Sequence, residues 1–144
     1  MEEFFFAKKG QGAFLNNIPI TVSETESLEK SLLATGFPYD IKENSYNNLA
    51  FFNHLIMRSQ AIRRDGSAAL NLCYLAMGRF DGFWEIKLSP WDIAAGSLIA
   101  SEAGGTLTNL NGESLSIYDN EIVATNGKIH EQLISEIQLI KKQI

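Results

Sequence analysis

The segment 82–105, GFWEIKLSPWDIAAGSLIASEAGG, contains the pattern that decides the fold. Its apolar beginning predicts a strand over 82–86, and Ser89 can cap a helix that has Pro90 at its first position. We expect this helix to run to Ala103, where two glycines stop it, and to pack through Ile93, Ala100 and Ala103. A strand followed almost at once by a helix is a building unit of layered α/β domains.

The rest of the chain shows the same alternation of strand and helix patterns. Turn residues and apolar spacing predict further strands over 4–7, 13–15, 18–22, 31–35, 61–64, 106–110 and 122–125, and helices over 45–59, 67–77 and 129–144. The helix over 45–59 is expected to bury one face made of Tyr46, Leu49, Phe52, Leu55 and Ile56. Residues 1–144 are therefore predicted to form one α/β (α+β layered) domain with a mixed sheet flanked by helices.

Composition restricts the class of protein. The chain has 144 residues, of which 45% are hydrophobic and 20% charged, as in ordinary globular domains. A net charge of −5 argues against a nucleic-acid-binding surface. We expect no membrane span and no signal peptide, because the apolar runs are short. Cys73 is the single cysteine, so it is expected to be a buried small hydrophobe in a cytoplasmic protein.

Two carboxylates near the strand-to-helix junction are candidates for chemistry. Asp92 falls in the first turn of the predicted helix, where the helix dipole favours an ionised carboxylate, the kind of ligand that Mg²⁺ prefers. Its spacing from Ser89 also fits a capping box, which would make it purely structural. Glu85 ends the predicted strand, where ligands bind in α/β sheets, or it is simply a solvated carboxylate. The residues alone leave both alternatives open.

A third candidate is the start of the helix predicted over 67–77. The amides around Gly66, Ser67 and Ala68 could bind an anion or a hydroxyl oxygen, although Ser67 is equally suited to be a plain N-cap. His54 and His130 each stand in a helical pattern without a second metal ligand nearby, so we expect surface or packing roles for both.

Several sequence blocks together resemble one family. The blocks are RRDGSAAL at 63–70, AMGRFDGFWE at 76–85, WDIAAG at 91–96, EAGG at 102–105 and KGQGAF at 9–14. In order and spacing they resemble the inositol monophosphatase family, and its bacterial SuhB branch in particular. The resemblance covers nearly the whole chain and implies the carboxyl-terminal half of that fold.

The resemblance also implies roles for individual residues. Asp92 matches the family's aspartate that binds a catalytic Mg²⁺, and Glu85 matches the glutamate that holds substrate hydroxyls. Ala68 matches the alanine of the loop that contacts the sugar ring, with Gly66 and Ser67 beside it. The implied activity is Mg²⁺-dependent hydrolysis of a phosphate monoester such as inositol 1-phosphate. No residue is assigned as a general acid, base or nucleophile.

One departure from the family pattern is large. The run Asp-Pro-x-Asp-Gly-Thr and the upstream Gly-Glu-Glu, which supply the family's other metal ligands, are not in this sequence. We therefore expect an incomplete and inactive half site, with exposed apolar surface that meets a missing amino-terminal half or a second copy. The alternatives are a SuhB-like protein that binds the transcription machinery and acts in ribosomal RNA maturation, or a degenerate product without function.

Overall fold

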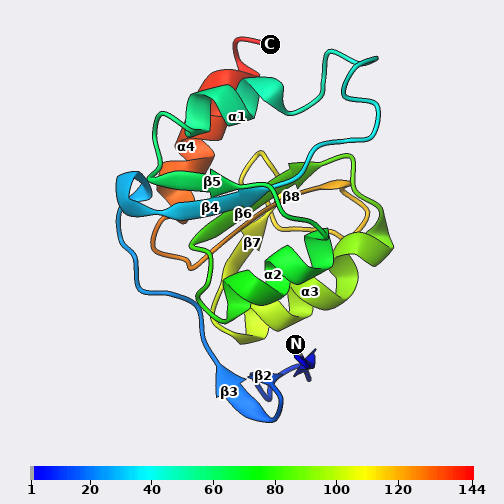
Figure 1. Cartoon of the computed structure of the whole chain (residues 1–144), viewed down its shortest axis with the longest axis vertical. Coiled ribbons are helices and arrows are strands. Elements are labelled where there is room, and N and C mark those ends of the chain that lie inside the picture. Colours follow the sequence, from blue (N-terminus) through cyan, green and yellow to red (C-terminus); the bar gives the residue numbers. More distant parts are fainter. Residues whose placement is uncertain (1) are drawn as a thin grey trace.

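The computed structural model describes residues 2–144, which form two sheets and four α-helices arranged in layers (Figure 1). The strands are β1 (Phe5–Ala7), β2 (Ala13–Leu15), β3 (Ile18–Ile20), β4 (Leu32–Thr35), β5 (Ala61–Arg63), β6 (Gly82–Ile86), β7 (Thr106–Thr108) and β8 (Glu121–Thr125). The helices are α1 (Leu49–Leu55), α2 (Ala68–Ala76), α3 (Pro90–Glu102) and α4 (His130–Lys141), and a short 3-10 helix spans Leu28–Lys30.

The larger sheet is mixed, as predicted. Its strand order is β5-β4-β6-β8-β7, in which β4 pairs in parallel with β5 and β6, and β8 pairs antiparallel with β6 and β7. Helices α2 and α3 cover one face of this sheet, and α1 and α4 cover the other (Figure 1). The smaller sheet, β1-β2-β3, is antiparallel and packs against α3. The predicted α/β fold is confirmed.

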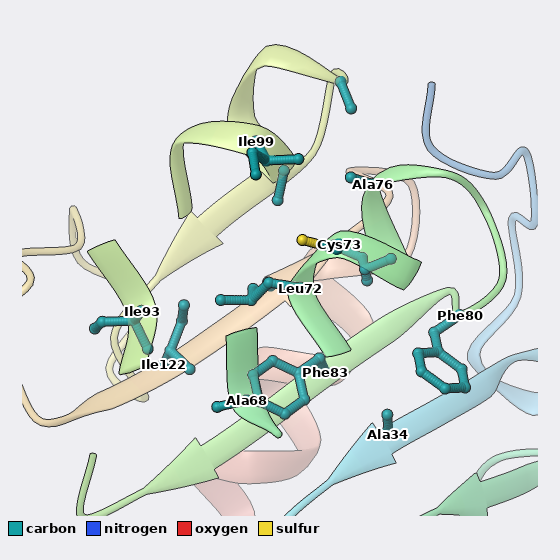
Figure 2. Packing of buried hydrophobic residues seen from close by; sticks show 14 of the residues in the cluster. Ala34, Ala68, Leu72, Cys73, Ala76, Phe80, Phe83, Ile93, Ile99 and Ile122 are labelled. Carbon is teal, nitrogen blue, oxygen red and sulfur yellow. The ribbon is translucent and has the colours of Figure 1, made fainter. Parts of the chain in front are cut away.

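The core beneath α2 and α3 is built from apolar side chains of both helices and of the sheet. Leu72, Phe83 and Ile93 are all fully buried there (Figure 2). A Cβ atom at Gly96 would lie 2.7 Å from the Cβ of Leu72, so the two helices can approach this closely only with glycine at that position. The predicted packing of α3 through Ile93, Ala100 and Ala103 is confirmed, since each is buried.

Cys73 lies in the same core, and burial raises the pKa of its thiol to about 11. A thiol that stays protonated at neutral pH is a poor nucleophile, so the predicted role as a small buried hydrophobe is confirmed.

The predicted helix over 45–59 is wrong in extent, and its predicted buried face is confirmed only at Leu55 and, in part, at Phe52. Asn48 has a left-handed backbone with φ of 79°, so the helix cannot continue back through it, and α1 spans only Leu49–Leu55. Phe51 and Leu55 face the core, whereas Tyr46, Leu49 and Ile56 are exposed by 38%, 43% and 38%. Tyr46 lies before the helix and Ile56 after its last residue, so neither belongs to its buried face.

Several other element boundaries differ from the prediction by one to three residues. The strand expected over 106–110 ends at Thr108, because the Asn109 Oδ1 accepts hydrogen bonds from the Asn111 and Glu113 amides and turns the chain. The helix expected over 129–144 ends at Lys141. Within residues 2–144, no helix combines the length and apolar character that crossing a membrane requires.

The two histidines have structural surroundings. The ring nitrogens of His130 lie 2.9 Å from the Thr108 hydroxyl and 3.0 Å from the Thr125 hydroxyl, and burial lowers the pKa of the imidazole. His54 contacts the Glu136 carboxylate across the α1–α4 interface. Both roles agree with the prediction of packing or surface histidines.

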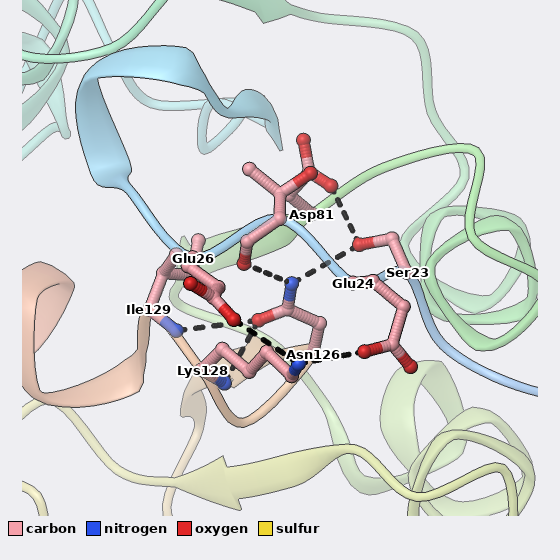
Figure 3. Close-up of polar contacts among 8 residues, drawn as sticks. Ser23, Glu24, Glu26, Asp81, Asn126, Lys128 and Ile129 are labelled. Carbon is pink, nitrogen blue, oxygen red and sulfur yellow. Dashed lines mark hydrogen bonds and ion pairs between the residues drawn. The ribbon is translucent and has the colours of Figure 1, made fainter.

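A buried polar cluster ties the segment after β3 to the larger sheet (Figure 3). The Asp81 carboxylate accepts a hydrogen bond from the Ser23 hydroxyl at 2.6 Å. It also accepts one from the Leu32 amide at 2.7 Å. The Asn126 Nδ2 donates to Ser23 and to the Thr25 carbonyl. These contacts hold the connection between the two sheets and the start of β4. The other end of β4 borders the pocket described next.

Candidate active site

A pocket of about 460 Å³ opens where β4 and β6 end and where α2 and α3 begin. The five residues predicted for the site, Gly66, Ser67, Ala68, Glu85 and Asp92, all line it. They come from three separate segments of the chain. The remaining lining residues are Thr35, Gly36, Phe37, Pro38, Tyr39, Asp40, Arg64, Asp65, Ile86, Lys87 and Leu88.

Asp92 is both a helix cap and a pocket residue. Its Oδ2 accepts a hydrogen bond of 2.8 Å from the Ser89 amide, which is half of a capping box at the start of α3. No hydrogen bond within residues 2–144 uses its Oδ1. The two alternatives left open by the sequence are therefore compatible, because one carboxylate oxygen caps the helix while the side chain still lines the pocket.

Glu85 lies in the pocket wall with a carboxylate oxygen that has no hydrogen-bond partner within the described part of the chain. This oxygen, Oε2, is buried. Burial, with a smaller contribution from the Asp92 charge, raises the Glu85 pKa to about 7, while the Arg64 guanidinium opposes the increase. A buried carboxylate oxygen without a donor is costly unless a ligand or water satisfies it. The arrangement therefore marks Glu85 as a ligand-binding candidate.

The segment 66–68 starts α2 at the pocket wall. Gly66 has φ of +88°, a conformation that favours glycine, and the Ser67 Oγ accepts a hydrogen bond of 3.3 Å from the Leu70 amide as an N-cap. The N-cap interpretation of Ser67 is confirmed. Ala68 is 9% exposed and packs with the core cluster where the helix meets the pocket.

The pocket wall formed by residues 36–40 was not predicted from the sequence. Lys87 Nζ binds both carboxylate oxygens of Asp40, at 3.0 and 2.8 Å, and so holds this loop to the end of β6. The Arg64 guanidinium lies over the Phe37 ring at 5.6 Å from its centroid. Glycine and proline, as at Gly36 and Pro38, commonly follow the end of a strand. Nothing in the local pattern linked them to residues about fifty positions away.

The pocket offers the chemical type of ligand that Mg²⁺ prefers, but too few such ligands to hold the ion. Asp92 and Glu85 offer carboxylate oxygens, which are the ligands that Mg²⁺ takes in proteins. Within residues 2–144, however, no group of three or more His, Cys, Asp or Glu side chains is arranged to hold a metal ion. Asp92 would supply one ligand, and further anionic ligands would have to come from another polypeptide segment.

Comparisons with known proteins identify the family to which this layered fold and its carboxylate-lined pocket belong. The family model described as "Inositol monophosphatase family" matches residues 1–142. The chain is 48% identical to an inositol-1-monophosphatase of Synechocystis over 92% of its length, and 43% identical to the Nus factor SuhB of Pseudomonas aeruginosa over 95%. It superposes on the structure of an Anabaena inositol monophosphatase with a TM-score of 0.93 at 47% identity, covering 96% of this chain.

This chain therefore belongs to the inositol monophosphatase family, in its SuhB-like branch, and the predicted family is confirmed. The matches cover 46% of the Synechocystis protein, 51% of the Pseudomonas protein and 55% of the Anabaena structure. The chain thus spans about half the length of the relatives it matches.

Proposed function

We propose that residues 1–144 form the carboxyl-terminal half of a Mg²⁺-dependent phosphatase that hydrolyses inositol monophosphate or a related sugar phosphate. The observation that carries this proposal is the convergence of Glu85, Asp92 and the 66–68 segment on one pocket. The names of the Synechocystis and Anabaena relatives support inositol monophosphate as the substrate.

In this proposal each pocket residue has a role that its surroundings favour. The ionised Glu85 carboxylate accepts a hydrogen bond from a ring hydroxyl, which would satisfy its orphaned Oε2. The segment Gly66–Ala68 contacts the sugar ring with its backbone, and the buried Ala68 leaves room for that ring. Asp92 contributes one oxygen to a magnesium site. Bound magnesium in such sites activates water and stabilises charge on the phosphoryl oxygens.

We further propose that residues 1–144 are inactive alone, because one aspartate cannot hold the ions that two-metal phosphoryl chemistry needs. An amino-terminal half would supply the missing carboxylates. Two exposed apolar surfaces support such a partner. One is the outer side of α3, where Trp91 is 81% and Leu98 37% exposed; the other is the outer face of β1-β2-β3, which carries Phe4, Phe6 and Phe14.

Helix α3 connects these surfaces to the site. Its first turn carries Asp92, and at its other end Glu102 binds the amides of the β1–β2 turn. Thirteen residues of helix rise by about 20 Å, so a partner that covers the outer side of α3 reaches from the small sheet to Asp92. The same surfaces could instead be buried by a second copy of the chain.

The experiment is a phosphate-release assay on inositol 1-phosphate with magnesium, using this chain alone and mixed with a separately expressed amino-terminal half of the Synechocystis relative. We expect activity only in the mixture, and its loss in Asp92→Asn. Leu98→Asp should weaken association, whereas Leu139→Asp should not, since Leu139 is more exposed, at 49% against 37%, but lies on α4. Full turnover by the chain alone, abolished by Asp92→Asn, would refute the half-site proposal.

The second candidate function is binding to the transcription machinery. The observation in its favour is the 43% identity to a Pseudomonas protein named Nus factor SuhB. An interaction of this kind needs surface rather than a complete metal site. A pull-down with RNA polymerase and elongation factors tests it, and capture that survives both Asp92→Asn and Glu85→Gln would separate this role from catalysis.

A further inference from the structure

The Glu85 carboxylate occupies space that only a glycine at position 36 leaves open. A Cβ atom built on Gly36 would lie 2.3 Å from Glu85 Oε1, 2.6 Å from Cδ and 2.7 Å from Oε2. The backbone of Gly36 does not have a positive φ, so any residue could adopt its conformation. Gly36 is therefore required for the room it gives to Glu85 and not for its own flexibility.

A buried hydrogen-bond circuit centred on Asn48 fixes Gly36 and the strand that carries Glu85. The Asn48 Nδ2 donates to the Gly36 carbonyl at 2.6 Å and to the Thr35 hydroxyl at 2.9 Å. The Trp84 Nε1 donates to the Asn48 Oδ1 at 2.7 Å, and the Thr35 hydroxyl donates to the Trp84 carbonyl at 2.7 Å. The circuit thus joins the end of β4 to the residue directly before Glu85.

Asn48 makes these bonds at the expense of its own helix. It precedes α1 as the N-cap, yet its side chain makes no capping hydrogen bond, and its backbone is left-handed at φ 79°. The Leu49 amide instead donates to Asn47 Oδ1. Asparagine at this position normally caps the helix, and a left-handed non-glycine residue costs free energy. The missing cap and the left-handed backbone are both explained if the Asn48 side chain is needed to position residues of the pocket.

We propose that Gly36 and Asn48 are positioning residues that hold the Glu85 carboxylate in the pocket it shares with Asp92. Gly36 provides the space, and Asn48 locks Gly36 and Trp84 in register around it. This inference rests on the proposed function only in giving Glu85 a substrate-binding role. The positioning itself is a property of these 144 residues.

Gly36→Ala is the decisive variant, because the new methyl group would meet the flexible end of the Glu85 side chain and not backbone. The carboxylate should swing toward solvent while the domain stays folded. Carbon-13 NMR of the carboxyl groups, in a chelator, should show the Glu85 midpoint fall by at least one pH unit from about 7 toward its ordinary value of 4.5. The charged groups that face it, Asp92 and Arg64, are unchanged in this variant.

Gly82→Ala is the matched control at the other end of β6. Its Cβ would lie 2.8 Å from Leu33 Cδ2 in the core, so it should lower stability but leave the Glu85 midpoint unchanged. Asn48→Ala removes the hydrogen bonds to Thr35 and Gly36 without adding a charge, and should also lower the midpoint. An unchanged midpoint in a folded Gly36→Ala protein would overturn the role of Gly36, and an unchanged midpoint in a folded Asn48→Ala protein would overturn the role of Asn48.

Kinetics with the complementing half separate this inference from the proposed function. We expect Gly36→Ala and Glu85→Gln each to raise the KM for inositol 1-phosphate by about tenfold, as loss of one hydrogen bond to a charged group predicts. If Glu85→Gln leaves KM unchanged, the proposed role of Glu85 fails, and the NMR midpoint still decides whether Gly36 and Asn48 position it. If Glu85→Gln raises KM but Gly36→Ala does not, the positioning proposal fails.

Discussion

The two sheets of this domain differ in how completely they are covered. Helices lie on both faces of the five-stranded sheet, and its central strands β6 and β8 are almost wholly buried. The three-stranded sheet is packed against α3 on one face only. Its other face carries Phe4, Phe6 and Phe14, whose rings contact one another and not a core.

An antiparallel sheet with one free face normally carries polar residues there. Here both faces of the small sheet are apolar, since Phe5 and Ile20 pack inward while Phe6 and Phe14 point outward. The two sides of the pocket also differ in the contacts that their carboxylates make. The β6 side is built in detail around Glu85, whereas Asp92 on the α3 side has an unused oxygen, and no group of three or more potential metal-ligating side chains lies around it within residues 2–144.

The largest expected effect comes from removing one phenylalanine from each sheet. Phe83→Ala should lower the free energy of unfolding by about 3–5 kcal/mol, because Phe83 is fully buried in the core. Phe14→Ala should cost less than about 1.5 kcal/mol, since it loses mainly one stacked ring partner. Urea unfolding of both variants measures the difference. Equal losses would show that the outer aromatic face is packed as firmly as the core.

Features that depend on residues near one another in the sequence could be predicted, whereas features that depend on contacts between distant residues could not. The bounds of β2 and β6 were predicted correctly, because turn residues and strand patterns are local. From the residues alone, Asp92 could be either a helix cap or a metal ligand. The family resemblance led us to expect Glu85, Asp92 and residues 66–68 in one site. Asn48 and Gly36 were missed, since their roles come from contacts with Trp84 and Glu85, 36 and 49 positions away.

A smaller effect is expected in the pH dependence of stability, through Glu85 on β6 of the five-stranded sheet. The Glu85 pKa is about 7 in the folded chain and ordinarily 4.5, so the folded state holds the proton more tightly. Its contribution to stability is complete below about pH 4.5 and is lost as pH rises through 7. Glu85→Gln should remove this loss. Relative to wild type it should gain about 1–3 kcal/mol between pH 5 and pH 8.5, a range that allows for solvent screening at the pocket mouth.

Denaturant unfolding at several pH values, in a chelator, measures this gain. A difference between the two proteins that stays constant from pH 5 to pH 8.5 would contradict the burial of Glu85. The Phe83 and Glu85 variants together would show that the covered sheet is stable in its core and destabilised at its pocket edge, as is usual for functional sites.

The smallest effect concerns the anchor of the poorly covered sheet. The Glu102 carboxylate accepts hydrogen bonds from the Gly10 amide at 2.6 Å and from the Gly12 amide at 3.0 Å, and so ties the β1–β2 turn to the end of α3. In Glu102→Gln one acceptor oxygen becomes a donor NH₂ group, which cannot serve the second amide. We expect a global loss of only about 0.5–1 kcal/mol. Amide hydrogen exchange at Gly10 and Gly12 should nevertheless accelerate several-fold, because the small sheet opens locally while the larger sheet stays closed. Glu43→Gln, at an exposed loop position, is the control and should change neither quantity. Accelerated exchange in β6 and β8 as well would mean that the two sheets unfold as one unit, and the contrast between them would then concern coverage alone and not stability.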